Sequence, residues 1–200
     1  MNKKIETIID QIKSEFNLIP EDRKAALQTL SDFIKEKKQN TDLIFICVHN
    51  SRRSHLSQIW AQVASNHYGF NQIRCYSGGT EVTNMYPMIG ETLQDQGFDV
   101  QVLAKTENPI YALKYDANSH PIMGFSKIFD DSFNPQENFG AVMVCSSADT
   151  NCPYIATASK RILIPFEDPK AFDDTPQQKE KYAERSLQIA RELFYAFSQV

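Results

Sequence analysis

The residues best suited to chemistry form one short run, Cys47-Val48-His49-Asn50-Ser51-Arg52-Arg53-Ser54. A strand-like stretch over 42–46 leads into this run, and a helix-like stretch over 55–68 follows it. Where a strand passes into a helix, backbone N–H groups converge and the helix dipole is positive, which binds an oxyanion and lowers the pKa of a thiol. The run therefore predicts a nucleophilic thiolate at Cys47, at the bottom of an anion cradle.

Two further side chains of the run favour a catalytic cysteine over a buried structural one. Arg53 carries a planar guanidinium that can hold a tetrahedral oxyanion through two hydrogen bonds, and Ser54 can donate to the thiolate. We expect the oxyanion to be bound by the residues that follow the cysteine, namely Val48, His49, Asn50, Ser51, Arg52, Arg53 and Ser54.

Cys145 and Cys152 follow another predicted strand, and the loop between them is small and polar. They could be unrelated structural thiols, zinc ligands together with Cys47 and Cys75, or a pair that forms a disulfide after the loop moves. Zinc sites usually contain closely spaced Cys-x2-Cys pairs, which this chain lacks. The residues alone leave the structural and the redox interpretations open.

Asp168 precedes Pro169, just after a predicted strand over 161–165. The dipeptide by itself is typical of a turn. A position at a strand end would place the carboxyl on the same rim as Cys47, where it could protonate a leaving group. Beside Cys47 and Arg53, we expect Asp168 to be the general acid.

Strands and helices alternate along most of the chain. Strands are predicted over 42–47, 72–77, 98–103, 140–145 and 161–165, and helices over 54–68, 86–96, 126–133 and 176–198. This order predicts an α/β fold with a parallel sheet, whose ligands bind at the carboxyl ends of the strands. We expect residues 1–40 to be a helical extension, residues 41–200 to be the catalytic domain, and 108–127 to be an inserted β-hairpin.

Composition narrows the function classes. With 42% hydrophobic and 23% charged residues, the chain is typical of a globular protein, and its net charge of −4 argues against nucleic acid as a partner. No apolar run reaches the length of a membrane span and the N-terminus lacks the pattern of a secretory signal, so we expect a cytoplasmic protein with reduced thiols. The histidines show no metal spacing, and we expect neither a metal nor a cofactor.

The run around Cys47 resembles the phosphatase loop of the low-molecular-weight protein tyrosine phosphatases, with matches at Cys47, Asn50, Ser51, Arg53 and Ser54. The segment 76–80 resembles the one that follows the second strand of that family, and 166–169 resembles its aspartate-proline loop. Residues 145–153 resemble the redox segment of the thioredoxin-coupled arsenate reductases, with two cysteines seven positions apart and a proline after them. The resemblance covers about residues 42–198.

This resemblance implies a three-layer α/β sandwich around a mostly parallel four-stranded sheet, and an arsenate reductase mechanism. In it, Cys47 attacks arsenate, Asp168 protonates the departing hydroxide, Cys145 attacks the Cys47 adduct, and Cys152 then leaves a Cys145–Cys152 disulfide for thioredoxin. Three positions depart from the family pattern. Arg52 stands where such reductases often have a cysteine, Gln58 stands where some relatives have a carboxylate that helps to hold potassium, and 170–172 lack an adjacent aromatic pair.

Two other functions use the same residues. A phosphatase for phosphotyrosine or small phosphomonoesters would employ Cys47, Arg53 and Asp168 identically, with water attacking the thiophosphoryl intermediate. A non-catalytic anion sensor would bind oxyanions through the same cradle without turnover, and would leave the cysteine pair and Asp168 without a purpose. The missing aromatic pair disfavours a phosphotyrosine substrate.

Overall fold

Four parallel strands form the central sheet of the computed structural model, which describes residues 1–144 and 155–200. The strands are β1 (Asp42–Cys47), β2 (Arg74–Gly79), β6 (Phe139–Met143) and β7 (Ala158–Leu163), in the order β2-β1-β6-β7. The chain leaves β1 toward β2 on one side and later returns to β6 on the other side. Such a switch in strand order opens a crevice at the carboxyl end of the strand, where β1 ends in Cys47.

Strand β1 lies inside the sheet because nearly all of its residues are apolar. Its sequence Asp-Leu-Ile-Phe-Ile-Cys has no polar alternation, and every residue after Asp42 is buried. A strand covered on both faces has this composition, whereas a half-exposed strand alternates. Cys47 is therefore attached to a strand that is covered on both faces.

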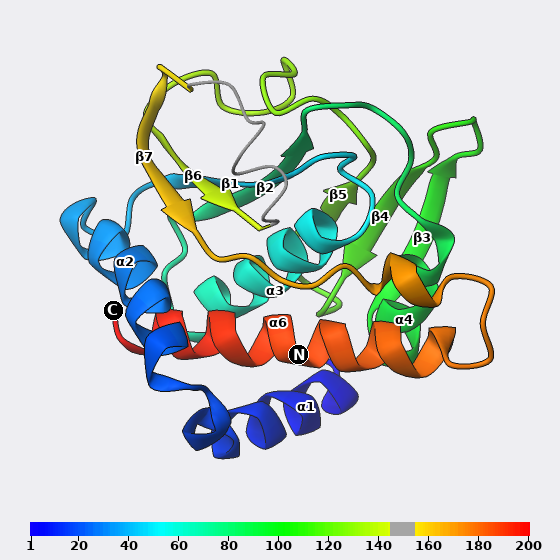
Figure 1. Cartoon of the computed structure of the whole chain (residues 1–200), viewed down its shortest axis with the longest axis horizontal. Helices are drawn as coiled ribbons and strands as arrows, with labels where there is room; N and C mark the ends of the chain where they lie inside the picture. The colour runs from blue at the N-terminus through cyan, green and yellow to red at the C-terminus, as the bar shows by residue number, and fades with distance from the viewer. Residues whose placement is uncertain (145–154) are drawn as a thin grey trace.

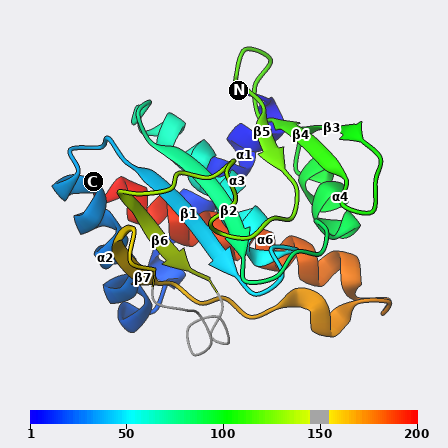
Figure 2. The ribbon, with the colours of Figure 1, turned by 90° about the horizontal axis from the view of Figure 1, so that it is seen from above.

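Helices α3 (Arg53–His67) and α6 (Gln178–Ser198) are the main helices under the sheet. Figure 1 shows the sheet, α3, α6 and α1 (Lys3–Ser14) stacked one below another, and Figure 2 shows the strands from above with these helices behind them. Helix α3 contacts β1 and β2 as well as α6, and the shorter α4 (Pro87–Asp95) contacts α6. The predicted α/β fold, with a four-stranded parallel sheet flanked by helices, is confirmed.

The N-terminal helices share the hydrophobic core of the sheet domain. Asn2 caps α1 by accepting from the N–H of Lys4, and the isoleucines on one face of α1 are buried. After the short 3-10 helix η1 (Phe16–Leu18), helix α2 (Glu21–Glu36) contacts β7 and α6. The ring of Phe33 lies so close to Gly140 in β6 that a Cβ there would be 2.6 Å from it, so this contact requires a glycine. The division of the chain at residue 40 stays a prediction.

A second, antiparallel sheet consists of β3 (Asp99–Ala104), β4 (Ile110–Lys114) and β5 (Ile122–Gly124), in that order. The hairpin predicted within 108–127 is the β4–β5 pair. The strand predicted over 98–103 pairs with this hairpin instead of joining the central sheet. Among the described residues, no helix has both the length and the apolar character required to cross a bilayer.

The helix predicted over 126–133 is wrong. Residues 126–128 run along the end of β2, because Gly79 donates to the carbonyl of Lys127 and Phe129 donates to the carbonyl of Gly79, and the residues after them form turns. The N–H of Lys127 is bound by the side chain of Asn50. These tertiary hydrogen bonds outweigh the local preference for a helix.

Candidate active site

Cys47 ends β1, and α3 begins at Arg53, so the cysteine lies at the strand-to-helix junction that the sequence predicts. The Cys47 sulfur lies 3.1 Å from the hydroxyl oxygen of Ser54, which in turn accepts from the Asn50 side-chain amide at 2.8 Å. Because Asn50 supplies the hydrogen that Ser54 accepts, the hydroxyl hydrogen of Ser54 can point at the sulfur. This arrangement favours the thiolate, since a hydrogen bond to the charged form stabilises it.

The loop between Cys47 and α3 is held by its carbonyl groups. The carbonyls of residues 48–52 all accept hydrogen bonds from groups outside the loop or from α3. The donors are the N–H groups of Thr80, Glu81, Tyr86 and Leu56, the hydroxyls of Thr80, Thr83 and Ser126, and the His55 ring. In the described part of the chain, the N–H groups of residues 49–52 donate to no protein group. The loop therefore presents amides on one side and binds the rest of the protein with its carbonyls, which is the geometry of an anion-binding nest.

Close approach of β2 to this loop depends on Gly79. A Cβ at this position would lie 2.5 Å from the carbonyl oxygen of Val48 and 2.8 Å from the backbone nitrogen of Asn50. Asn50 itself has φ of 43°, a left-handed conformation that asparagine tolerates better than most residues. The segment 76–80 and the loop thus fit only with these two residue types at their contact.

His55 supports Asn50 from within the protein. It is fully buried, its Nε2 lies 2.9 Å from the Asn50 carbonyl oxygen, and its Nδ1 lies 3.3 Å from the Ser77 hydroxyl. Burial lowers the pKa of His55 to about 3, so the ring is neutral and can donate from Nε2 while accepting from Ser77 at Nδ1. Sequence reasoning did not identify this role of His55, because no spacing rule connects it to its tertiary partners Asn50 and Ser77.

Arg53 connects the loop to the predicted general acid. Its Nη2 lies 2.7 Å from Oδ2 of Asp168, and its Nη1 donates to the Phe166 carbonyl at 2.9 Å. The third nitrogen, Nε, is buried and has no hydrogen-bond partner among the described residues. Asp168 also accepts from the N–H of Lys170, which fixes its carboxylate at the start of the 3-10 helix η2 (Pro169–Phe172). The structure thus brings Asp168 to the rim of the cysteine loop.

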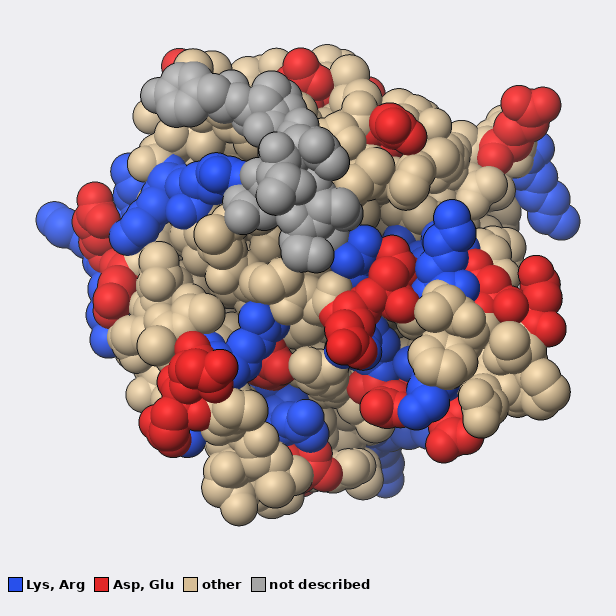
Figure 3. Space-filling view, viewed as in Figure 1, with Lys and Arg blue, Asp and Glu red and all other residues tan. Residues whose placement is uncertain are grey.

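An open cleft lies between the two segments that carry these groups. Among the described residues it is lined by Val48, His49, Arg53, Pro165, Phe166, Glu167, Asp168 and Lys170. This lining combines charged side chains with apolar ones, and its single Phe, Tyr or Trp side chain in the described part of the chain, Phe166, is buried against the guanidinium of Arg23. Figure 3 shows basic and acidic side chains interspersed on the face seen there, rather than one continuous basic surface.

Arg52 has a role that sequence reasoning missed. Its guanidinium is directed away from the amide side of the loop, where it donates to the carboxylate of Asp173 and to the hydroxyl of Tyr182 in α6. The same guanidinium stacks over the ring of Tyr86, 4.1 Å from its centroid. Arg52 can contribute its backbone N–H to the cradle but not its side chain. Asp173, 121 positions further along the chain, gave no signal that could have identified this pairing.

The remaining candidates divide into two groups. His49 lines the cleft, and its Nε2 lies 3.4 Å from a carboxylate oxygen of Glu81. Cys75 is buried in β2, where burial raises the pKa of its thiol. Cys145 and Cys152 lie outside the described residues, so their predicted redox roles stay predictions. Within residues 1–144 and 155–200, no three His, Cys, Asp or Glu side chains are grouped so as to hold a metal ion.

Comparison with known proteins agrees with this geometry. Residues 42–117 match the family described as low molecular weight phosphotyrosine protein phosphatase. An arsenate reductase of Staphylococcus aureus (strain Newman) is 27% identical over 128 residues, which cover 64% of this chain and 77% of that relative. Arsenate reductase 2 of Staphylococcus epidermidis (strain RP62A) is 26% identical over 127 residues, with the same coverage of 64% and 77%.

Two solved structures share the fold. One is an arsenate reductase in the phosphate binding state, with a TM-score of 0.52 and 15% identity, covering 80% of this chain and 98% of that chain. The other is a mutant of YwlE from Bacillus subtilis, with a TM-score of 0.50 and 14% identity, covering 80% and 98%. At these identities the similarity establishes the architecture of the site's scaffold and not its substrate.

Proposed function

The chain carries a domain of the low molecular weight phosphotyrosine protein phosphatase family and is an enzyme of that family, and we propose that its reaction is the reduction of arsenate to arsenite. The observation that carries the proposal is the pairing of Arg53 with Asp168 at 2.7 Å beside the Cys47 loop. It brings the proposed oxyanion-binding guanidinium and the proposed acid together beside the loop that begins at Cys47, around a cleft in which Phe166 is buried and not exposed as a wall. Arsenate needs only these groups, whereas an aryl phosphate also needs a wall for its ring.

In the proposed first step, the Cys47 thiolate attacks arsenic and a hydroxide leaves. In this proposal the amides of residues 49–52, which donate to no protein group among the described residues, and the guanidinium of Arg53 hold the other oxygens. Asp168 supplies the proton that turns the leaving hydroxide into water.

The proposed second half of the reaction uses the two cysteines of 145–153. Cys145 attacks the Cys47 sulfur, the sulfur–arsenic bond breaks with its electron pair going to arsenic, and arsenite leaves. The two thiols have then lost two electrons and the arsenic has gained two. Cys152 next attacks Cys145 and releases Cys47, and thioredoxin reduces the Cys145–Cys152 disulfide. Support comes from the arsenate reductase relatives and from the cysteine spacing in the sequence.

Phosphomonoester hydrolysis is the second candidate, because the family match rests on the same residues. Cys47, Arg53 and Asp168 form a complete phosphatase set without any contribution from Cys145 or Cys152. In that reaction water would attack a cysteinyl phosphate, and the two cysteines would protect the nucleophile or remain idle. A non-catalytic sensor is the least supported function, since it gives the Arg53–Asp168 pair no purpose.

Steady-state turnover separates these functions. Arsenate is assayed with thioredoxin, thioredoxin reductase and a nicotinamide reductant, and p-nitrophenyl phosphate hydrolysis is measured on the same preparation. We expect arsenate-dependent consumption of the reductant that vanishes in Cys47→Ser and falls in Cys145→Ser and Cys152→Ser. Phosphoester hydrolysis that is indifferent to Cys145 and Cys152, without arsenate turnover, would establish the phosphatase instead.

A further inference from the structure

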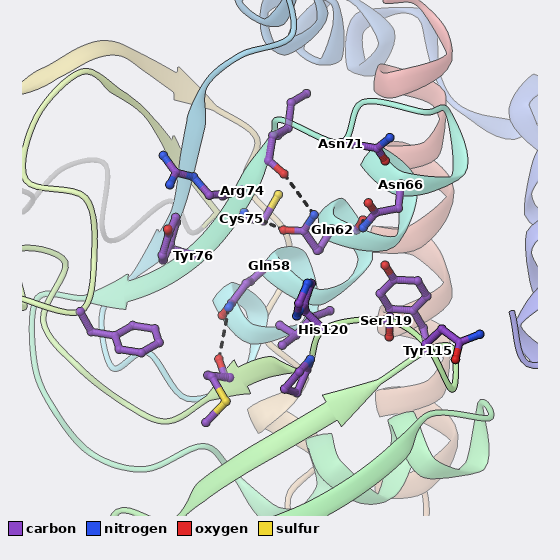
Figure 4. A pocket seen from close by; sticks show the side chains of 16 residues that line it. Gln58, Gln62, Asn66, Asn71, Arg74, Cys75, Tyr76, Tyr115, Ser119 and His120 are labelled. Carbon is purple, nitrogen blue, oxygen red and sulfur yellow. Dashed lines mark hydrogen bonds between the residues drawn. The ribbon is translucent and has the colours of Figure 1, made fainter.

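The two outer strands of the central sheet have different neighbours. Along β2, the carboxamide of Gln62 accepts from the N–H of Cys75 at 2.9 Å and donates to the carbonyl of Ile73 at 3.1 Å (Figure 4). None of the described residues that line the cavity of about 510 Å³ at this edge also lines the cleft at Cys47. Along β7, the N-terminal helix α2 packs against the sheet, and the chain leaves this strand toward Asp168 (Figures 1 and 2).

Phe166 is the last point at which the described chain is bonded to the sheet before Asp168. Past the end of β7 the chain continues along β6, where the N–H of Phe166 donates to the carbonyl of Val144 at 2.9 Å. The carbonyl of Phe166 in turn accepts from Nη1 of Arg53 at 2.9 Å, and Asp168 follows two positions later. The position of Phe166 therefore influences both members of the Arg53–Asp168 pair.

The ring of Phe166 is held by a residue of the N-terminal helices. Ile162, Ile164 and Phe166 are buried while the residues between them are exposed, so the ring continues the inward face of β7. The guanidinium of Arg23 in α2 lies over this ring, 4.7 Å from its centroid. A cation over an aromatic face contributes roughly a twofold to thirtyfold factor to an equilibrium constant, with the larger values where the contact is desolvated.

Arg23 is itself fixed by the long helix α6. Its Nε donates to one carboxylate oxygen of Glu192, and Gln188 donates to the other oxygen at 2.9 Å. The side chain of Glu192 is only 4% exposed and that of Arg23 only 16%, so this ion pair is held in place. The guanidinium is thus fixed between α6 and the Phe166 ring.

We infer that Arg23 is a positioning residue of the active site, which acts through the Phe166 ring on the backbone that carries Asp168 and binds Arg53. Arg23 lies in α2, outside the segment 42–117 that matches the phosphatase family. The N-terminal helices therefore take part in the reaction as well as in the hydrophobic core. The inference rests on the proposed function for the reaction that Arg23 supports, and on the contacts of Phe166 for the way in which it does so.

A double-mutant cycle on the full-length protein tests this route. Arg23→Met removes the cation at similar length, and Phe166→Leu removes the ring. We expect Arg23→Met to lower kcat/KM for arsenate and for phenyl phosphate roughly threefold to thirtyfold, and to cause no further loss when Phe166→Leu is already present. The same loss with and without Phe166→Leu would overturn the inference, because Arg23 would then act only by joining α2 to α6.

Lys24→Met is the matched control. Lys24 follows Arg23 on the same helix, pairs with Glu21, and also lies over an aromatic ring, that of Tyr195. It should keep the wild-type rates, and a loss in Arg23→Met no larger than that in Lys24→Met would also overturn the inference. Because Arg23→Met leaves Glu192 buried without its cation, Arg23→Met/Glu192→Gln replaces it in the cycle if the single variant does not fold.

Amide chemical shifts provide a measurement that needs no turnover. The N–H of Lys170 donates to the carboxylate of Asp168, so its signal reports the position of the acid. We expect this signal to move in Arg23→Met and to stay in place in Lys24→Met. If the wild type turned over neither arsenate nor phenyl phosphate, the proposed function would fail, and the Lys170 signal would still decide the inference. An unchanged signal in Arg23→Met would refute it.

Discussion

Arg52 donates to the carboxylate of Asp173, although its neighbour Arg53 is paired with Asp168. Two adjacent arginines of the cysteine loop therefore hold two carboxylates of one later segment, 168–173. The Arg52 guanidinium is 11% exposed and also binds Tyr182 of α6, so this contact is buried and anchored on a long helix. Arg53 lines the cleft, whereas Arg52 holds the 168–173 segment that carries Asp168, the predicted general acid.

This relationship predicts that Arg52 positions Asp168. In Arg52→Met we expect kcat to fall roughly tenfold to a hundredfold while KM changes little, because misplacing a catalytic group by a small distance is costly. Phenyl phosphate, whose leaving group needs a proton, should suffer more than p-nitrophenyl phosphate, whose leaving group does not. Arg191→Met, which removes an ion pair between α6 and Glu15, is the matched control. Equal losses for both esters would show that Arg52 serves only the fold.

The nucleophile is predicted to be Cys47 and not the other described cysteine. Cys47→Ala should abolish turnover of both arsenate and p-nitrophenyl phosphate, whereas Cys75→Ala should retain it with a modest loss of stability. Cys75 is buried in β2 with a raised thiol pKa, which disfavours its thiolate at neutral pH. Alkylation by iodoacetamide, read out by mass spectrometry of the peptides, gives an independent check. Preferential labelling of Cys75 in the native protein would contradict this assignment.

Arg53 and Asp168 should differ in the kinetic constant that they control. Asp168→Asn keeps the size of the side chain and removes the proton, so kcat should fall about a hundredfold to ten-thousandfold. Arg53→Lys keeps the charge and loses the planar fork, so inhibition by inorganic phosphate should weaken as well. Initial-rate kinetics with phosphate as competitor measures both effects. If phosphate bound to Arg53→Lys as tightly as to the wild type, Arg53 would not hold the oxyanion.

His55 makes the folded protein sensitive to acid. Its pKa is about 3 in the folded state and near 6.5 in an unfolded chain, so between these values the unfolded chain binds the extra proton. Stability therefore rises with pH in this window and is lost as the pH falls from 6.5, at no more than about 1.4 kcal/mol per pH unit from this group. The measurement is urea unfolding at several pH values. As the pH falls, the free energy of unfolding should decrease more steeply in the wild type than in His55→Gln, whose amide can still donate to Asn50. If the unfolding free energy of the two proteins depended on pH in the same way, protonation of His55 would not destabilise the folded state.

Much of this architecture was predictable because it follows from local patterns. The apolar run of β1, the cysteine at its end and the helix after it specify the nucleophile's position without any tertiary information. Asp168 could be placed on the same rim because parallel strands end at one edge of a sheet. The strand over 98–103 was predicted too, but its pairing with the hairpin was not, because the sequence of a strand does not specify which sheet the strand joins.

The missed features depend on contacts between distant residues. Segment 126–133 has a helix-like composition, but hydrogen bonds with Gly79 and Asn50 hold its first residues beside β2, and the rest forms turns. His55 looked like an ordinary polar residue of a helix, although it supports the loop from a fully buried position. Arg52 and Asp173 are far apart in the chain, and no spacing rule pairs them. Such pairings are specified by the whole fold and not by any window of sequence.

The carbonyl groups of residues 48–52 tie the chemistry of Cys47 to the integrity of the whole fold. Three side-chain hydroxyl contacts that orient them come from residues 32, 34 and 77 positions away along the chain. A nascent or partly unfolded chain has no such contacts, so its amides point at random and its cysteine is an ordinary thiol. We therefore expect the reactivity of Cys47 to depend on the completed fold, and to be lost in a chain in which β2 or the 126–133 segment has separated from the loop.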